Sequence, residues 1–144
     1  MPEFILDHGS PEGAAMFYAF DSFTQGYVEA MFFTDASSAD DGDLAGATVA
    51  DLSQEAIDRI QADCRAFQTG PAGELLFSIY ESDTPYSPAQ AGRDFWYSRN
   101  GHGVGFWDRG LGPIGDKLSS ACGWRTQFGE LDLYRGDDGR VYFA

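Results

Sequence analysis

The residues whose types and spacing could bind a ligand or catalyse a reaction lie in one short segment, between Asp94 and Gly112, with the sequence DFWYSRNGHGVGFWDRGLG. Within it, Asn100, His102, Asp108 and Arg109 are the candidates for binding a ligand or moving a proton. Alternating glycines surround the histidine, and glycine lets the backbone take positive φ or approach another backbone closely. The same pattern also fits a structural turn, in which the aromatic residues enter the core while Asp108 and Arg109 pair locally or cap a helix. We favour the structural interpretation and keep a binding or catalytic loop as the alternative.

Specific chemistries fit this segment poorly. A phosphate-binding loop needs Lys directly after its last glycine, whereas Asp116 separates Gly115 from Lys117. The glycines around His102 also lack the strand, turn and helix of a dinucleotide fingerprint. A nucleophile could be Ser98 or Cys122, but no local pattern supports either. We therefore predict no catalytic residue.

A metal site is not predicted either. His8 is the only other histidine in the chain, and carboxylates occur throughout it. A single histidine in a glycine-rich turn is usually a hydrogen-bonded structural residue rather than a ligand. We therefore expect neither a metal nor a cofactor.

Charge is distributed very unevenly along the chain. The first 58 residues contain twelve carboxylates and no Lys or Arg, and the whole chain carries a net charge of −14. Because phosphate neutralisation requires Lys or Arg, this third is not expected to bind nucleic acid directly. A basic protein surface is its natural complement, although acidity can also serve solubility or adaptation to high salt. The candidate partner-binding residues are Asp35, Asp40, Asp41, Asp43, Asp51, Glu55 and Asp58.

Two motifs carry a resemblance. The runs RNGHGVGFWDRGLG and LYRGDDGRVY resemble a functionally uncharacterised family of small proteins carried by bacteriophages and plasmids, over roughly residues 87 to 143. That family supplies no activity and no catalytic residue. What the resemblance implies is a context, because small accessory proteins of mobile elements often inhibit host defences or modify host enzymes.

Charge and resemblance together predict a non-enzymatic inhibitor. Such a protein would occupy the basic nucleic-acid-binding surface of a host defence protein, as a nucleic-acid mimic of the anti-restriction or anti-CRISPR kind. The alternative is a small enzyme or ligand-binding domain that uses the glycine-rich loop around His102. A third hypothesis is an assembly protein with an exposed aromatic patch. We expect a monomer or a small homo-oligomer.

Length and composition favour one soluble domain over residues 1–144. The chain has 144 residues, 43% of them hydrophobic and 15% aromatic, which suffices for one core. Cys64 and Cys122 have no metal-type spacing and fall on apolar helix stripes, as expected of free thiols in a reducing compartment. No signal peptide and no apolar stretch of about 20 residues is apparent. We therefore expect a cytoplasmic protein that does not enter the membrane.

Periodicity predicts a mostly α fold of the α+β class, a helical bundle with a small C-terminal antiparallel hairpin. A first helix is expected over residues 14–33 and an exposed loop over 37–46. The next helix begins at Asp51 or Ser53 and ends at Gly70 and Pro71. Residues 74–81 fit a helix better than a strand, although periodicity does not decide between them.

The second half of the chain has clearer boundary signals. Ser87, Pro88 and Gln90 predict a helix start with a closed capping box, and Asn100 with Gly101 predicts its end. A short helix follows Gly112 and Pro113. The hairpin is expected to pack on the helices through four apolar residues: Leu131, Leu133, Val141 and Phe143.

Overall fold

A computed structural model describes residues 5–36 and 42–144. In these residues the chain forms α1 (Pro11–Ala19), α2 (Ser22–Asp35), the 3-10 turn η1 (Val49–Asp51), α3 (Gln54–Thr69), α4 (Pro71–Tyr80), α5 (Pro88–Asn100), the 3-10 turn η2 (Phe106–Asp108), α6 (Pro113–Ser120), and strands β1 (Leu133–Arg135) and β2 (Val141–Phe143). The strands pair antiparallel, with Tyr134 opposite Tyr142. The predicted fold class, mostly α with a small C-terminal hairpin, is confirmed.

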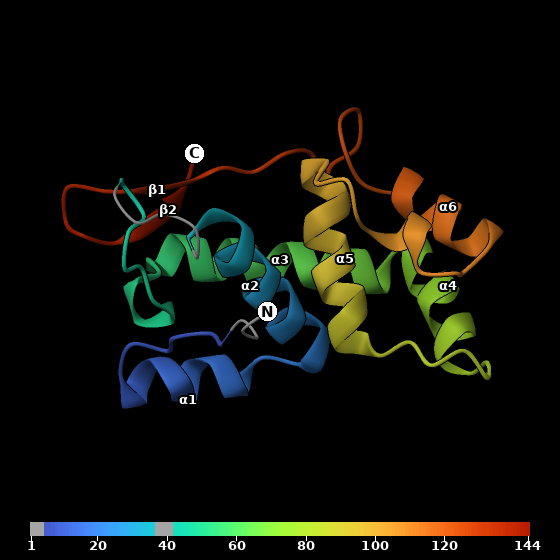
Figure 1. The fold of residues 1–144 in the computed structure, drawn as a ribbon, viewed down its shortest axis with the longest axis horizontal. Coiled ribbons are helices and arrows are strands. Elements are labelled where there is room, and N and C mark those ends of the chain that lie inside the picture. Colours follow the sequence, from blue (N-terminus) through green and yellow to red (C-terminus); the bar gives the residue numbers. More distant parts are fainter. Residues whose placement is uncertain (1–4, 37–41) are drawn as a thin grey trace.

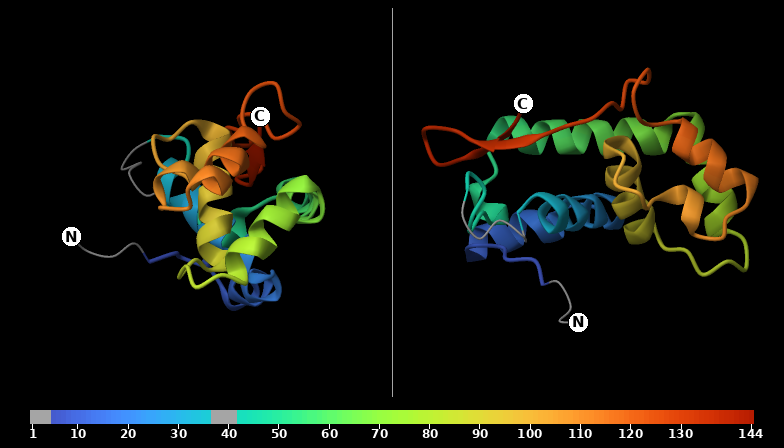
Figure 2. Two further views of the ribbon diagram at one scale, coloured as in Figure 1. Left: turned by 90° about the vertical axis from the view of Figure 1, so that its right-hand side faces the viewer. Right: turned by 45° about the horizontal axis from the view of Figure 1, so that its top comes forward.

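The elements are arranged along the longest helix. Figures 1 and 2 show α3 running along the length of the molecule, with the hairpin near its beginning and α4 and α6 near its end. Helix α2 packs chiefly against α5, which crosses the middle of the molecule. The C-terminal hairpin therefore lies at the same end of the molecule as η1 and the first turn of α3, although it is far from them in sequence.

The prediction of one helix over residues 14–33 is wrong, because the chain forms two helices there. Helix α1 ends at Ala19, and Phe20 caps it in extended conformation. Asp21 then begins α2, because its carboxylate accepts a hydrogen bond of 2.8 Å from the backbone N–H of Thr24. The aromatic stripe that suggested one helix is nevertheless buried as expected, so both helices contribute to one core.

Side-chain caps define the later helix starts. Ser53, the second of the two predicted starts, caps α3 by accepting from the N–H of Ala56 at 3.1 Å. Ser87 caps α5 in the same way, as predicted. The prediction of a closed capping box at the start of α5 is wrong, because the side-chain amide of Gln90 contacts Asp94 and Arg93 instead of the backbone of Ser87.

The remaining boundaries follow the sequence closely. Residues 74–81 are helical, as favoured, and belong to a helix that already begins at Pro71. Gly101 ends α5 in the left-handed conformation, with φ of 66°. The predicted loop at 37–46 is a turn over its described part, residues 42–46, and residues 37–41 lie outside the described residues.

One apolar cluster forms the core. Phe67 of α3 stacks on Phe95 of α5 with ring centroids 4.2 Å apart, and both rings are fully buried. Cys64 and Cys122 are buried free thiols, as the apolar stripes predicted. The hairpin joins this core through all four predicted residues, of which Leu131 and Val141 are buried and Leu133 and Phe143 are packed against it.

The crossing of α2 and α5 depends on two glycines. A Cβ atom on Gly26 would lie 1.9 Å from the carbonyl oxygen of Ala89, and one on Gly92 would lie 1.8 Å from that of Phe23. Each glycine therefore lets the backbone of the other helix approach more closely than any side chain permits. This close approach explains why glycine occurs inside α2 despite its low helix propensity.

Candidate partner-binding surface

The glycine-rich loop uses three of its four candidate residues to hold the fold together. Asn100 accepts from the N–H of Leu131 at 2.8 Å and donates to the carbonyl of Trp96 at 3.0 Å. Asp108 accepts from the N–H of Gly105 at 2.9 Å, which closes the turn before η2. Arg109 reaches back to α5 and contacts Asp94, with 2.9 Å between Nη2 and Oδ1. These contacts and the burial of Phe106 agree with the structural interpretation of the loop. The expectation that Trp107 also enters the core is wrong, because its side chain is 55% exposed.

His102 differs from the other three residues of the loop. Its side chain is exposed and lies edge-on to the ring of Tyr97, with 6.3 Å between the ring centroids. It is also close enough to Asp35, at the end of α2, to interact with it electrostatically. Burial raises the pKa of Asp35, while the hydrogen bond from Thr34 and the nearby His102 oppose that rise. The fold thus brings together one loop candidate and one acidic candidate.

A buried carboxylate that sequence reasoning missed lies under this loop. Asp94 is 0% exposed and accepts hydrogen bonds from the Tyr86 hydroxyl at 2.5 Å and from Gln90 at 3.1 Å, in addition to its contact with Arg109. Burial of Tyr86, followed by the charge of Asp94 and the hydrogen bond to it, raises the pKa of the Tyr86 phenol, which therefore keeps its proton and remains a donor. The signal that could have revealed it is the position of Asp94 on the apolar stripe of α5, three residues after Ala91 and next to Phe95, both of which are buried.

A second buried ion pair was also missed. Arg99 is 1% exposed and donates to Asp63 at 2.8 Å, to the hydroxyl of Tyr27 at 3.1 Å and to the carbonyl of Gly129 at 2.9 Å. The ring of Phe95 lies beneath the guanidinium, 5.3 Å from its central carbon. Because Arg99 connects three helices to the chain before the hairpin, its role is structural.

The acidic candidates of the N-terminal third are only partly assembled. Asp43 and Asp51 meet at Arg135 of β1, since Asp43 accepts from the backbone N–H of Arg135 at 2.6 Å and Asp51 lies 3.9 Å from its guanidinium. Glu55 and Asp58 are exposed on the first turns of α3. Asp35 lies apart at the end of α2, and Asp40 and Asp41 lie outside the described residues.

The hairpin adds charges of both signs to this region. Strand β2 lies beside the start of α3, because the backbone N–H of Ser53 donates to the carbonyl of Val141 at 3.0 Å and Tyr142 lies near Glu55. Tyr142 also donates to Asp138 of the hairpin turn at 2.6 Å. Hydrogen bonds from Tyr142 and from the backbone lower the pKa of Asp138. We call the resulting group the anionic end, and its members are Asp43, Asp51, Glu55, Asp58, Asp137 and Asp138.

The two arginines of the hairpin neutralise the anionic end only in part. Arg135 donates to the carbonyls of Asp43 and Ala45, and Arg140 donates to the carbonyl of Ala50. The six carboxylates thus outnumber the two guanidinium groups of the hairpin, both of which are held by backbone oxygens. Arg59, which follows Asp58 on α3, is paired with Asp63. Acidic side chains are not confined to this region, because Glu74, Glu81, Asp83 and Asp116 are exposed elsewhere.

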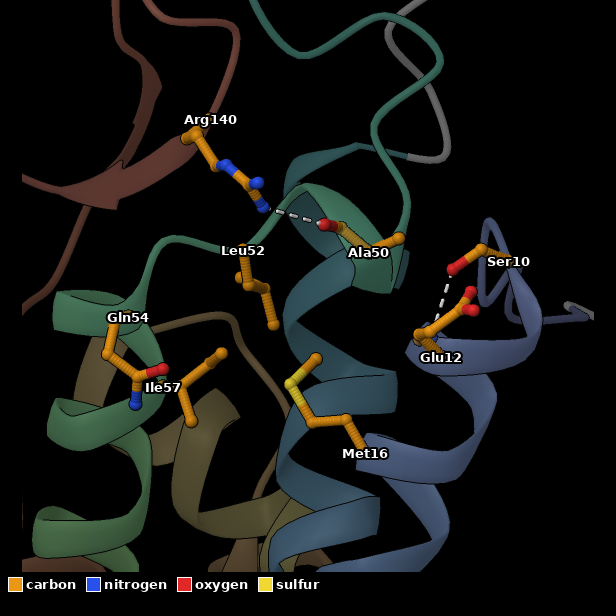
Figure 3. A pocket seen from close by; sticks show the side chains of 9 residues that line it. Ser10, Glu12, Met16, Ala50, Leu52, Gln54, Ile57 and Arg140 are labelled. Carbon is orange, nitrogen blue, oxygen red and sulfur yellow. Dashed lines mark hydrogen bonds between the residues drawn. The ribbon is translucent and has the colours of Figure 1, made fainter.

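A pocket of about 580 Å³ adjoins the anionic end (Figure 3) and lies between α1, η1, α3 and the hairpin. Leu52, Met16 and Ile57 form its apolar floor, while Glu12 and Arg140 stand on opposite sides of it (Figure 3). Its remaining lining residues are Ser10, Gly13, Ala50 and Gln54. Gln54 connects the pocket to the anionic end, since its amide donates to Asp58 at 2.8 Å.

Two other pockets adjoin α3, one between it and the junction of α1 and α2, and one between its end and α4. One of about 380 Å³ is lined by Asp21 and Arg65, and one of about 400 Å³ is lined by Glu74 and Phe77. No residue from 94 to 112 lines any of these three pockets. In the described ranges 5–36 and 42–144, no group of three or more His, Cys, Asp or Glu side chains could hold a metal ion.

Comparison with known proteins gives no family assignment. No protein-family model matches the chain, and no curated protein or solved structure is significantly similar to it. The resemblance to proteins of mobile elements therefore stays a prediction. Among the helices of the described residues, none has the length and apolar character needed to cross a membrane.

Proposed function

We propose that this protein is a non-enzymatic binding protein that docks its anionic end on the basic surface of a nucleic-acid-binding protein. The observation that supports this proposal most directly is the position of the hairpin, which adds Asp137 and Asp138 to the acidic residues that precede and begin α3. Carboxylates held on folded elements can meet Lys and Arg through charge-assisted hydrogen bonds. Such pairing gives fast, salt-sensitive association.

The partner class follows from charge complementarity. A surface that contacts DNA or RNA presents Lys and Arg spaced for phosphates, and a rigid set of carboxylates competes for it. Because the chain also resembles phage and plasmid proteins, we extend the proposal and name a cytoplasmic host defence protein as the partner. Three of the four loop candidates hold the fold together, which makes an enzyme at the glycine-rich loop the weaker alternative.

Charge reversal at matched positions tests the proposal. Glu55 and Glu74 each lie in the first turn of a helix, α3 and α4 respectively, so reversal to Lys disturbs both helix dipoles similarly. Only Glu55 belongs to the anionic end. Wild type, Glu55→Lys and Glu74→Lys are each used as bait in a nuclease-treated bacterial lysate, and the bound proteins are identified by mass spectrometry.

We expect wild type and Glu74→Lys to recover a nucleic-acid-binding protein that Glu55→Lys recovers poorly. Elution should occur as salt rises, because the Debye length falls from about 10 Å at 0.1 M to about 3 Å at 1 M. Equal recovery by the two variants, or a complex unaffected by salt, would refute docking through the anionic end.

A further inference from the structure

The pocket beside the anionic end indicates that a partner needs an apolar side chain in addition to its positive charge. We propose that it receives an apolar side chain of the partner, while Glu12 binds a Lys or Arg next to that side chain. This proposal rests on the proposed function and deepens it, since it assigns the partner segment a chemistry, an apolar residue adjacent to a basic one.

The floor of the pocket supports the apolar part of this assignment. Of the three apolar residues of the floor, Leu52 is 2% exposed, and Met16 and Ile57 are half-buried. Figure 3 shows these three side chains converging on one hollow, Leu52 from the residue after η1, Met16 from α1 and Ile57 from α3. Methionine adapts its shape to the group it contacts. Interfaces gain most of their affinity from a few side chains buried in such pockets within a polar rim.

The rim of the pocket supports the assignment of a basic residue next to the apolar one. Glu12 is exposed and forms no ion pair with any described residue. Arg140, on the opposite side, is held by the carbonyl of Ala50 at 3.2 Å. Asp58, which Gln54 contacts, adds a second carboxylate near the pocket mouth. With two carboxylates and one guanidinium at its edge, the pocket favours a cationic segment over an anionic one.

Continuity with the anionic end supports a single partner surface. Pocket residues and acidic residues alternate along the chain, as Ala50 and Leu52 line the pocket while Asp51 contacts Arg135. The pocket wall continues through Gln54 into the exposed first turns of α3. A segment that places an apolar side chain in the pocket therefore lies beside Glu55 and Asp58, where further basic residues can bind.

Short peptides test the assignment without knowledge of the partner. The probes are acetylated and amidated tetrapeptides of sequence Gly-Leu-Arg-Gly, Gly-Ser-Arg-Gly and Gly-Leu-Glu-Gly. Each is titrated at millimolar concentration into ¹⁵N-labelled protein while amide resonances are followed by NMR. We expect only the Leu-Arg peptide to shift the amides of Gly13, Leu52 and Gln54 in a saturable way. Equal shifts with the Ser-Arg or Leu-Glu peptide would overturn the proposal, as would no shift with any peptide.

Variants separate the pocket from general charge attraction. Gln54 is exposed, and Gln54→Trp should fill the pocket mouth and abolish the shifts, while Ala62→Trp on an exposed position of the same helix should leave them unchanged. Glu12→Gln should weaken binding of the Leu-Arg peptide about two- to five-fold, as expected for one exposed ion pair. If the Gln54→Trp variant binds the Leu-Arg peptide as tightly as wild type does, the peptide binds outside this pocket and the proposal fails.

The two experiments distinguish failure of the pocket assignment from failure of the proposed docking on a nucleic-acid-binding protein. If the peptide binds the pocket but the lysate yields no basic protein, the chemistry of the pocket stands and docking on a nucleic-acid-binding protein fails. If a basic protein is captured equally by wild type and Gln54→Trp, docking stands and the pocket assignment fails.

Discussion

Arg109 of the glycine-rich loop and Asp94 of α5 form an ion pair in which the side chain of Asp94 is 0% exposed and that of Arg109 is 30% exposed. Tyr86 and Gln90 complete the hydrogen bonding of the same carboxylate. The pair anchors the loop to the helix from which it departs. Arg109 is therefore directed toward the protein interior, which argues against a substrate-binding role for this side chain.

The first prediction concerns this pair. Arg109→Ala leaves a buried carboxylate without its cation, so the free energy of unfolding should fall by about 3 kcal/mol, at the lower end for a broken buried pair. Lys117→Ala is the control, because Lys117 is an exposed cation without an ion pair among the described residues, and it should change stability by less than about 0.5 kcal/mol. Urea denaturation followed by circular dichroism measures both. Equal stability of the two variants would show that the pair does not anchor the loop.

The second prediction concerns the crossing of α2 and α5. Helix propensity alone predicts that Gly26→Ala stabilises α2 by about 1 kcal/mol. The structure predicts the opposite sign, because the new methyl group would overlap the carbonyl of Ala89, and overpacking of this kind costs about 1–3 kcal/mol or more. Gly129→Ala is a matched control, since nothing lies within 4 Å of its added Cβ. A thermal melt of each variant decides the sign.

Local signals in the sequence predicted the helix ends well. Ser53, Ser87 and Gly101 act as caps through contacts within a few residues, and such contacts can be recognised from residue type and spacing alone. The same reasoning failed at Asp21. The regular spacing of aromatic residues across this position predicted one continuous helix, although Asp21 is a residue type that often caps a helix start. Both helices on either side of Asp21 turn their aromatic residues toward one core, so the period continues across the break.

Long-range pairing could not be predicted in this way. Asp63 and Arg99 are 36 residues apart, and Asp43 and Arg135 are 92 apart. Which carboxylate meets which guanidinium depends on the crossing of helices and the return of the hairpin, and no residue pattern encodes it locally. For the same reason the sequence revealed the acidic character of the N-terminal third but not its contacts with hairpin arginines or the pocket beside it.

The third prediction concerns the two thiols. Burial raises the pKa of Cys122 to about 12 and also raises that of Cys64. Because the thiolate is the reactive form, neither cysteine should react with an aromatic disulfide reagent near pH 8 in the native protein. Both should react once urea unfolds the chain, releasing two equivalents of product. Rapid reaction of either thiol in the native protein would show that its helix opens far more readily than the packing indicates.

The fourth prediction follows from the cap of α2. Burial raises the pKa of Asp21, but hydrogen bonds from Thr24 and Gln68 and the charge of Arg65 outweigh it, so that the pKa lies below 3.8. A carboxyl group with a lowered folded-state pKa stabilises the fold above its unfolded-state value, and this contribution is lost as pH falls through the folded-state value. Asp21→Ala should therefore cost about 0.5–2 kcal/mol near neutral pH and less in strong acid.

A neutral cap provides the comparison for this pH dependence. Ser87 caps α5 through its hydroxyl, which does not titrate, so the cost of Ser87→Ala should not vary with pH through this cap. Urea denaturation of wild type and both variants is compared at about pH 7, where Asp21 is ionised, and at about pH 2.5, where the unfolded carboxyl group is protonated. The difference between wild type and Asp21→Ala should shrink at the lower pH while that for Ser87→Ala persists. If both differences shrink together, general acid destabilisation rather than the charge of Asp21 accounts for the change.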